Sequence, residues 1–147
     1  MVDYPNKESS AVDAIKSAIP SSLKKDMLGE SKGMFAELYE NKVFPDHYMA
    51  CAIDGVGTKV IIAEAMGKYD TIGIDLVAMS ANDLATIGSV SPFLFMDALS
   101  CQNNVQEELI TKKIIEGIVK GLNKCDASKI LRNSIGINFG KGETASV

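Results

Sequence analysis

Short apolar runs alternate along this chain with helical patterns, two of which end at glycine, and this alternation restricts the possible folds more than any other feature. The apolar runs predict strands at 48–53, 92–99 and 134–139. The spacing of apolar residues predicts helices at 11–19, 58–66, 75–87 and 105–124. Gly67 and Gly88 follow two of these helices, where glycine commonly ends a helix. Strands interleaved with helices indicate a mixed domain of the α/β or α+β class with one mostly buried sheet.

The composition fits one globular domain and excludes several classes of function. The chain has 147 residues, of which 46% are hydrophobic and 23% are charged, enough for a core of its own. Its net charge of −4 disfavours nucleic acid as a partner, and no window reaches the roughly 18 uncharged apolar residues that a membrane span needs. Three cysteines without close pairs argue against a disulfide framework or a zinc ribbon, and predict reduced, buried thiols in a cytoplasmic protein.

The segment DGVGTK at 54–59 predicts a sharp turn between the first strand and the helix that follows it. Gly55 and Gly57 allow the backbone to turn and to approach a ligand without an intervening Cβ. The Walker spacing G-x-x-x-x-G-K is absent, so the turn is not a P-loop.

The other residues of this segment have the chemistry of a phosphate and metal site. Thr58 and Lys59 stand at the predicted helix start, where free N–H groups favour anions and the lysine adds a mobile positive charge. Asp54 adds a hard oxygen ligand of the kind that Mg²⁺ binds. On spacing alone, a plain strand–turn–helix corner in which Asp54 caps the helix is about equally well supported.

The segment TIGIDLVAMSANDL at 71–84 carries two carboxylates in an otherwise apolar stretch. On a helix, Asn82 lies almost directly above Asp75, and Asp83 lies beside Asn82. Carboxylates among apolar residues must be paired, hydrogen-bonded or metal-bound, because a lone buried charge is too costly. The alternatives are that Asp75 is a helix N-cap and that Asp83 faces water. Mg²⁺ takes only one or two carboxylates directly, so not every one of these groups need be a ligand.

The segment GKGET at 140–144 stands at the predicted end of the last strand. If the strands are neighbours, Glu143 is a further acidic group directed at the same place, as in many metal and phosphate sites at strand ends. Taken alone, the pentapeptide also fits an ordinary exposed turn.

Together these segments closely resemble those of aminoimidazole ribonucleotide synthetase, also called phosphoribosylformylglycinamidine cyclo-ligase. That family carries DGVGTK, then TIGIDLVAM followed by NDL, then a strand ending in GGETAE. Here the corresponding segments lie at 54–59, 71–79, 82–84 and 140–146. SPFLFMDAL at 91–99 is similar to the family's strand after the NDL helix, and the resemblance covers residues 30–146.

The resemblance implies an N-terminal α+β (mixed α/β) domain, with a mixed sheet flanked by helices that pairs across a homodimer into a barrel. It implies ATP and Mg²⁺ as ligands and formylglycinamidine ribonucleotide as the substrate of an ATP-driven ring closure in de novo purine biosynthesis. Phosphoryl transfer of this kind needs positioning and charge neutralisation more than a protein nucleophile. No catalytic residue is therefore assigned.

The resemblance also implies a set of binding residues. The nucleotide and its phosphates would be bound by Asp54, Gly55, Gly57, Thr58, Lys59, Asn82 and Thr144. The metal would be bound by Asp54, Asp75, Asp83 and Glu143.

Three departures from the family pattern stand out. The loop at 29–33 has fewer glycines than in family members, and Lys141 replaces a glycine of GGET, where it strains the turn or adds a phosphate contact. The third departure is that family members continue into a second domain. We expect residues 1–33 to form a flexible helix and loop. We expect residues 34–147 to form the ATP- and Mg²⁺-binding half of the enzyme, which is inactive without the second domain.

Two other functions are consistent with the residues. One is a stand-alone nucleotide-binding or dimerisation module. The other is the chemistry of a relative such as selenophosphate synthetase, thiamine-monophosphate kinase or formylglycinamidine ribonucleotide synthetase. These relatives share the fold and the acidic site but not this string of motifs.

Overall fold

The computed structural model describes residues 4–88, 90–101, 107–126 and 136–146. The chain divides into two compact units, and each is described by itself. The first unit comprises Met1–Gly33 and Glu37–Ala50, and the second comprises Met34–Ala36 and Cys51–Val147. None of the helices described is both long and apolar enough to cross a membrane.

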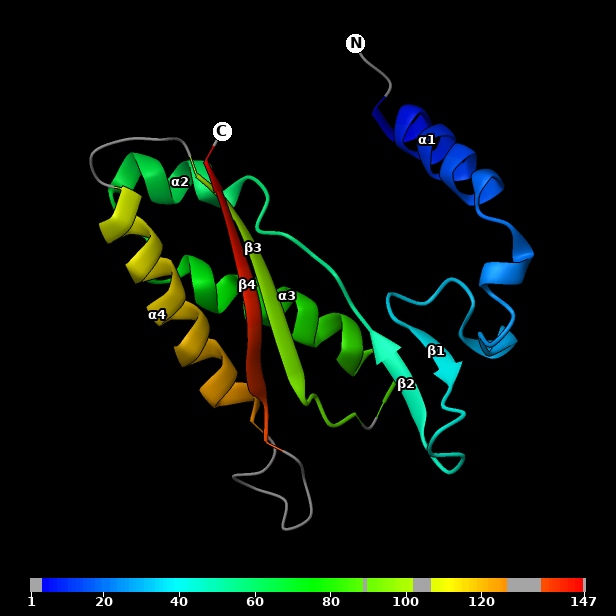
Figure 1. The fold of residues 1–147 in the computed structure, drawn as a ribbon. Coiled ribbons are helices and arrows are strands. Elements are labelled where there is room, and N and C mark those ends of the chain that lie inside the picture. The colour runs from blue at the N-terminus through cyan, green and yellow to red at the C-terminus, as the bar shows by residue number, and fades with distance from the viewer. Residues whose placement is uncertain (1–3, 89, 102–106, 127–135, 147) are drawn as a thin grey trace. The chain divides into compact units, whose positions relative to one another are not determined.

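The first unit contains helix α1, two short 3₁₀ helices and a two-stranded sheet (Figure 1). Their bounds are Tyr4–Ala18 for α1, Ser21–Leu23 and Gly29–Ser31 for the 3₁₀ helices, Glu37–Glu40 for β1 and Tyr48–Cys51 for β2. The buried side chain of Ser31 joins the second 3₁₀ helix to the sheet. Its Oγ donates to the Leu28 carbonyl at 2.8 Å and accepts the Leu38 N–H at 2.9 Å.

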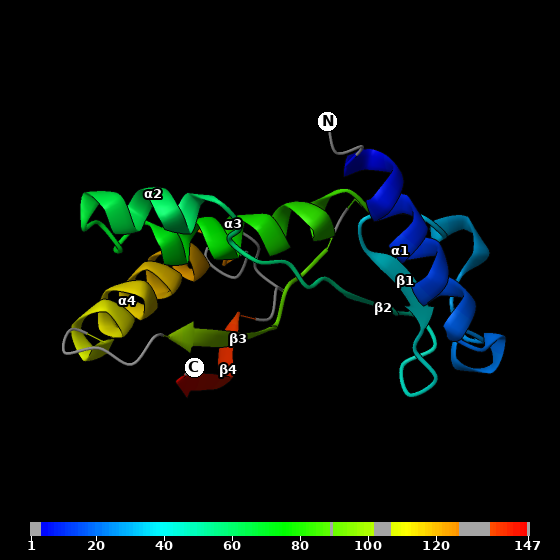
Figure 2. The same cartoon turned by 90° about the horizontal axis from the view of Figure 1, so that it is seen from above.

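The second unit contains three helices and a pair of strands, and Phe95 of the strand pair packs against the core of the second and third helices. Its elements are α2 (Lys59–Met66), α3 (Ile72–Ala85), β3 (Leu94–Cys101), α4 (Glu107–Cys125) and β4 (Asn138–Ser146). Strands β3 and β4 are parallel, as expected for strands joined through a helix. Helices α2, α3 and α4 all lie on one side of this pair (Figure 2). Side chains along β3 are alternately half-buried and exposed, which is the period of a strand covered on one face.

Helices α3 and α4 pack so closely that glycine is required where they meet. A Cβ on Gly73 would lie 2.2 Å from the Ile114 carbonyl oxygen, a distance that no side chain tolerates. The adjoining core consists of Val77, Ile118 and Leu122, all nearly inaccessible to solvent. The apolar stripe predicted along 105–124 therefore supplies the core, as expected for an amphipathic helix.

Several details differ from the sequence-based predictions. The described residues form two two-stranded sheets, not one mostly buried sheet. Helix α3 begins at Ile72 with Thr71 as its N-cap residue, so Asp75 is not the cap but lies in the first turn. Cys51 is exposed and the other two cysteines are half-buried, and all three are free thiols. Residues 105, 106, 134 and 135 of the predicted elements lie outside the described residues.

The last strand is the largest of these differences. GKGET was predicted to follow a strand, but β4 runs through it to Ser146. Pairing with β3 explains the difference, because a strand with a partner tolerates glycine and charged residues that disfavour an isolated strand.

Candidate functional site

The DGVGTK segment does not form the predicted sharp turn. Residues 54–57 are an irregular, exposed connection between β2 and α2, in which neither glycine has a positive backbone φ, and the polar groups of the segment are accessible. Asp54 Oδ1 accepts the N–H of its neighbour Gly55 at 2.7 Å. Thr58 is the N-cap residue of α2, and no side chain caps that helix end. The structure therefore differs from the alternative in which Asp54 caps the helix.

A direct ion pair joins two of the predicted motifs. Lys59 Nζ at the start of α2 lies 3.3 Å from Asp75 Oδ1 in the first turn of α3. The two side chains are 55% and 37% exposed, so solvent and a ligand can reach both. Residues 16 apart in sequence are thus brought together by the turn between the two helices. This contact places opposite charges at one accessible location.

Asn82 and Asp83 are further along α3. Seven residues of helix correspond to a rise of about 10 Å, so Asn82 and Asp83 lie roughly that far from Asp75 along the axis. Asn82 is exposed and Asp83 is half-buried. Because of this spacing, Asp75 and Asp83 occupy separate positions and cannot both bind one ion directly.

Glu143 and Thr144 lie within β4, opposite Ala98 and Leu99 of β3. Both side chains are exposed. Lys141, the residue that replaces a family glycine, is also exposed and lies within a strand rather than a turn. The strain predicted for a lysine in a turn therefore does not arise, since Lys141 has no positive backbone φ.

Asp97 was not predicted as a functional residue, although the structure gives it unusual surroundings. Asp97 lies on β3 opposite Gly142, and its Oδ1 is shielded from solvent without a hydrogen bond to any residue described. Burial raises the pKa of this carboxyl above its ordinary value, and a backbone hydrogen bond within Asp97 offsets only part of that effect. A Cβ on Gly142 would lie 2.7 Å from Oδ1, so the glycine leaves room for the carboxylate. The sequence signal that could have identified Asp97 was an acidic residue within the apolar run at 92–99.

The acidic residues described do not form a complete metal cage. Over the described ranges, no three His, Cys, Asp or Glu side chains gather closely enough to hold an ion. Mg²⁺ commonly uses one or two carboxylates together with water and substrate phosphates. Asp54 and Asp75 each have an accessible carboxylate, which is the kind of ligand that such a metal uses.

Residues 36–146 match the family model "AIR synthase related protein, N-terminal domain". This match spans most of the chain, and the chain therefore belongs to that family.

Individual relatives give a more specific similarity, and three of them share the name phosphoribosylformylglycinamidine cyclo-ligase. The protein of Thermococcus kodakarensis is 45% identical over 93 residues, covering 63% of this chain and 25% of the relative. That of Pyrococcus furiosus is 38% identical over 102 residues, covering 69% of this chain and 27% of the relative. That of Caldanaerobacter subterraneus subsp. tengcongensis is 39% identical over 120 residues, covering 82% of this chain and 34% of the relative. The chain thus spans about a quarter to a third of the length of these relatives.

Proposed function

We propose that this chain is the ATP-binding N-terminal part of a phosphoribosylformylglycinamidine cyclo-ligase. The observation that carries the proposal is the contact between Lys59 and Asp75, which joins the start of α2, at the end of the DGVGTK segment, to α3 within a chain of this family. A lysine and a carboxylate at one accessible point provide the two charges needed to hold a phosphate with its metal.

In this proposal the residues of the DGVGTK segment position the nucleotide. The backbone at Gly55 and Gly57 approaches the phosphates, and Thr58 and Lys59 donate to phosphate oxygens. Asp54 and Asp75 would hold Mg²⁺, which when bound neutralises phosphate charge. Asn82 and Thr144 would complete the nucleotide contacts, and Asp83 and Glu143 would act on the metal through its bound water rather than as direct ligands beside Asp75.

The proposed reaction is the ring closure that the relatives' name, cyclo-ligase, denotes. The formyl oxygen of formylglycinamidine ribonucleotide attacks the γ-phosphorus of ATP and ADP leaves. An amidine nitrogen then attacks the activated carbon, loses a proton and expels phosphate to close the ring. Such a reaction depends on holding two molecules in a near-attack geometry, and a preorganised binding site provides this geometry without a protein nucleophile.

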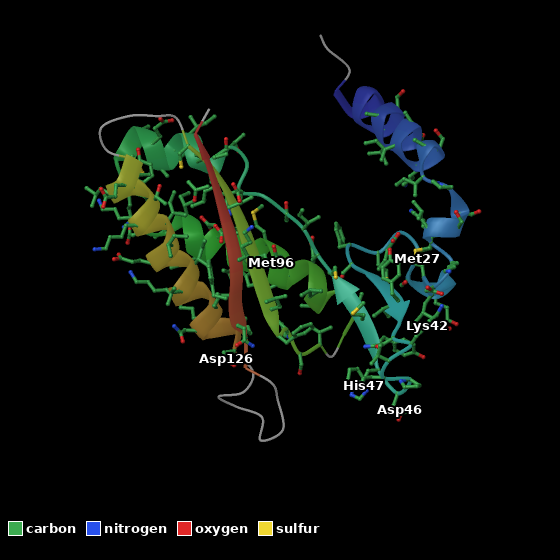
Figure 3. The ribbon with its side chains drawn as sticks, in the orientation of Figure 1. Met27, Lys42, Asp46, His47, Met96 and Asp126 are labelled. Atoms are coloured by element: carbon green, nitrogen blue, oxygen red, sulfur yellow. The ribbon has the colours of Figure 1, made fainter. Side chains whose placement is uncertain are left out.

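The proposal includes a homodimer in the cytoplasm. On β3, Leu94 and Met96 alternate with Phe95, which packs against the helical core, so both lie on the face away from the helices, where Met96 is 64% exposed (Figure 3). Pairing with a second copy would bury these side chains and cover open strand edges. The free thiols fit a reducing compartment, as in the cytoplasm.

A chimera tests the proposed function. Residues 36–146 would replace the matching segment of the Caldanaerobacter relative, and ADP release would be followed with and without formylglycinamidine ribonucleotide. The relative with its own segment serves as the control. We expect ADP release that depends on this substrate and falls at least about tenfold in the Asp54→Asn chimera. A chimera that melts cooperatively but releases no ADP would contradict the proposal, as would release that is independent of the substrate.

A further inference from the structure

Asp75 has two partners to accommodate. Its Oδ1 is 3.3 Å from Lys59 Nζ, and the proposed function requires the same carboxylate to hold a metal. An ammonium group and a divalent cation compete for one carboxylate oxygen, because each is attracted by the same charge. A divalent cation at Asp75 and a phosphate at Lys59 therefore each favour separation of this ion pair.

We propose, building on the function above, that Lys59 is a placeholder cation that pairs with Asp75 in the free protein and transfers to a phosphate oxygen when Asp75 takes the metal. The pair keeps the carboxylate neutralised before the nucleotide arrives. After the exchange, the lysine and the carboxylate each face a charge of opposite sign on the ligand.

The geometry of the pair suits such an exchange. Both side chains are more than one third exposed, and ion pairs of this kind contribute little to stability, so separation is easy. Lysine carries a compact charge on a flexible four-carbon stem and can therefore change partner without backbone movement. Lys59 is also the first residue of α2, next to the glycine-containing segment where the phosphates are expected.

A second ion pair provides a matched control. Lys68 Nζ lies 3.0 Å from Asp70 Oδ1, and the side chains are 53% and 41% exposed. This pair is local, joining residues two apart between α2 and α3, and neither residue belongs to the proposed site. Lys68→Gln changes the net charge as Lys59→Gln does, but frees a carboxylate that is not a proposed ligand.

The test measures the metal and the nucleotide separately. Mn²⁺, as a paramagnetic substitute for Mg²⁺, would be titrated into the wild-type chain, Lys59→Gln, Lys68→Gln and Asp75→Asn, and free Mn²⁺ read by electron paramagnetic resonance. Mg·ATP would be titrated into the same proteins by calorimetry. We expect Lys59→Gln to bind Mn²⁺ about two- to fivefold more tightly, since the competing cation is gone. The same variant should bind Mg·ATP at least about tenfold more weakly, because a charged hydrogen bond to phosphate is lost.

The opposite signs of these two changes distinguish exchange from other roles. Asp75→Asn should weaken Mn²⁺ binding, and Lys68→Gln should change neither affinity. Equal tightening in both lysine variants would reduce the effect to net charge and overturn the exchange, as would unchanged or weaker Mn²⁺ binding in Lys59→Gln. If the wild-type chain binds Mg·ATP but Lys59→Gln does not tighten Mn²⁺, the exchange alone fails. If the wild-type chain binds neither, the proposed function fails with it.

Discussion

Gly117 on α4 faces Gly73 on α3 so closely that a Cβ on Gly117 would lie 3.1 Å from the Gly73 Cα. The two helices therefore meet backbone to backbone, with the core residues Val77 and Ile118 beside the contact. Because Asp75 lies two residues after Gly73, the same contact fixes the part of α3 that carries the proposed metal ligand.

Gly73→Ala should destabilise the second unit by about 1–3 kcal/mol, since the new methyl group forces the helices apart. Chemical denaturation followed by circular dichroism measures this change. Gly29→Ala is the control, because a Cβ there meets no atom within 4 Å, and it should change stability by less than about 0.5 kcal/mol. Equal effects of the two substitutions would contradict the close helix contact.

Ser31→Ala should destabilise the first unit by about 1–3 kcal/mol, because the Leu38 N–H loses its acceptor in a buried position. Amide hydrogen exchange at Leu38 would accelerate accordingly. Ser17→Ala on α1 removes an exposed bond to the Ala14 carbonyl and should leave exchange at Leu38 unaltered. Unchanged protection at Leu38 in Ser31→Ala would show that this hydroxyl does not hold the loop to β1.

Asp97→Asn should stabilise the fold increasingly as pH rises. Burial raises the pKa of Asp97, so the folded state holds its proton more tightly than the unfolded state. Below about pH 4 both states are protonated and the carboxyl costs nothing. As pH rises through the unfolded and then the folded pKa, stability is lost, and the loss is complete above the folded value.

The measurement is the difference in melting temperature between Asp97→Asn and the wild type from pH 3.5 to pH 7. We expect this difference to grow with pH, because the substitution removes the cost of ionising the shielded carboxyl. A difference for Asp97→Asn that shrinks with rising pH would contradict a raised pKa at this carboxyl.

Met96→Glu should shift the chain from dimer to monomer, because it places a charge on the uncovered face of the β3–β4 pair. Sedimentation velocity at micromolar concentration would detect the shift. Val119→Glu, a similar change of an exposed apolar residue on α4, should leave the dimer intact. A wild-type chain that sediments as a monomer would contradict the proposed dimer.

The sequence predicts the helices better than the strands, for physical reasons. Helix 58–66 was expected and Lys59–Met66 is observed, because apolar periodicity and a terminal glycine are local signals. Gly73 concealed the true start of α3, since glycine opposes helix formation locally and is required here only by the packing of α4. The length of β4 likewise depends on its partner β3, which no local pattern reveals.

The candidate site was predictable as a set of residue types but not as an arrangement. The sequence places Lys59 and Asp75 in separate motifs, and only the packing of α2 and α3 brings their side chains to 3.3 Å. Asp97 was missed because a single carboxylate in an apolar strand forms no motif with other residues at a fixed spacing. That its Oδ1 is shielded from solvent becomes evident only from the structure.

The most direct test of the proposed nucleotide site is calorimetric titration of ATP into the wild-type chain and Asp54→Asn, with and without Mg²⁺, together with their melting temperatures. We predict that the wild-type chain binds ATP more tightly with Mg²⁺. Asp54→Asn should lose this metal-dependent gain at a nearly unchanged melting temperature, because its side chain lies in an exposed connection between β2 and α2 and not in the core. A wild-type chain that binds no ATP would contradict the proposed site. An Asp54→Asn variant that melts far lower but retains the full affinity for Mg·ATP would also contradict it, since the segment at 54–59 would then support the fold and not bind the ligand.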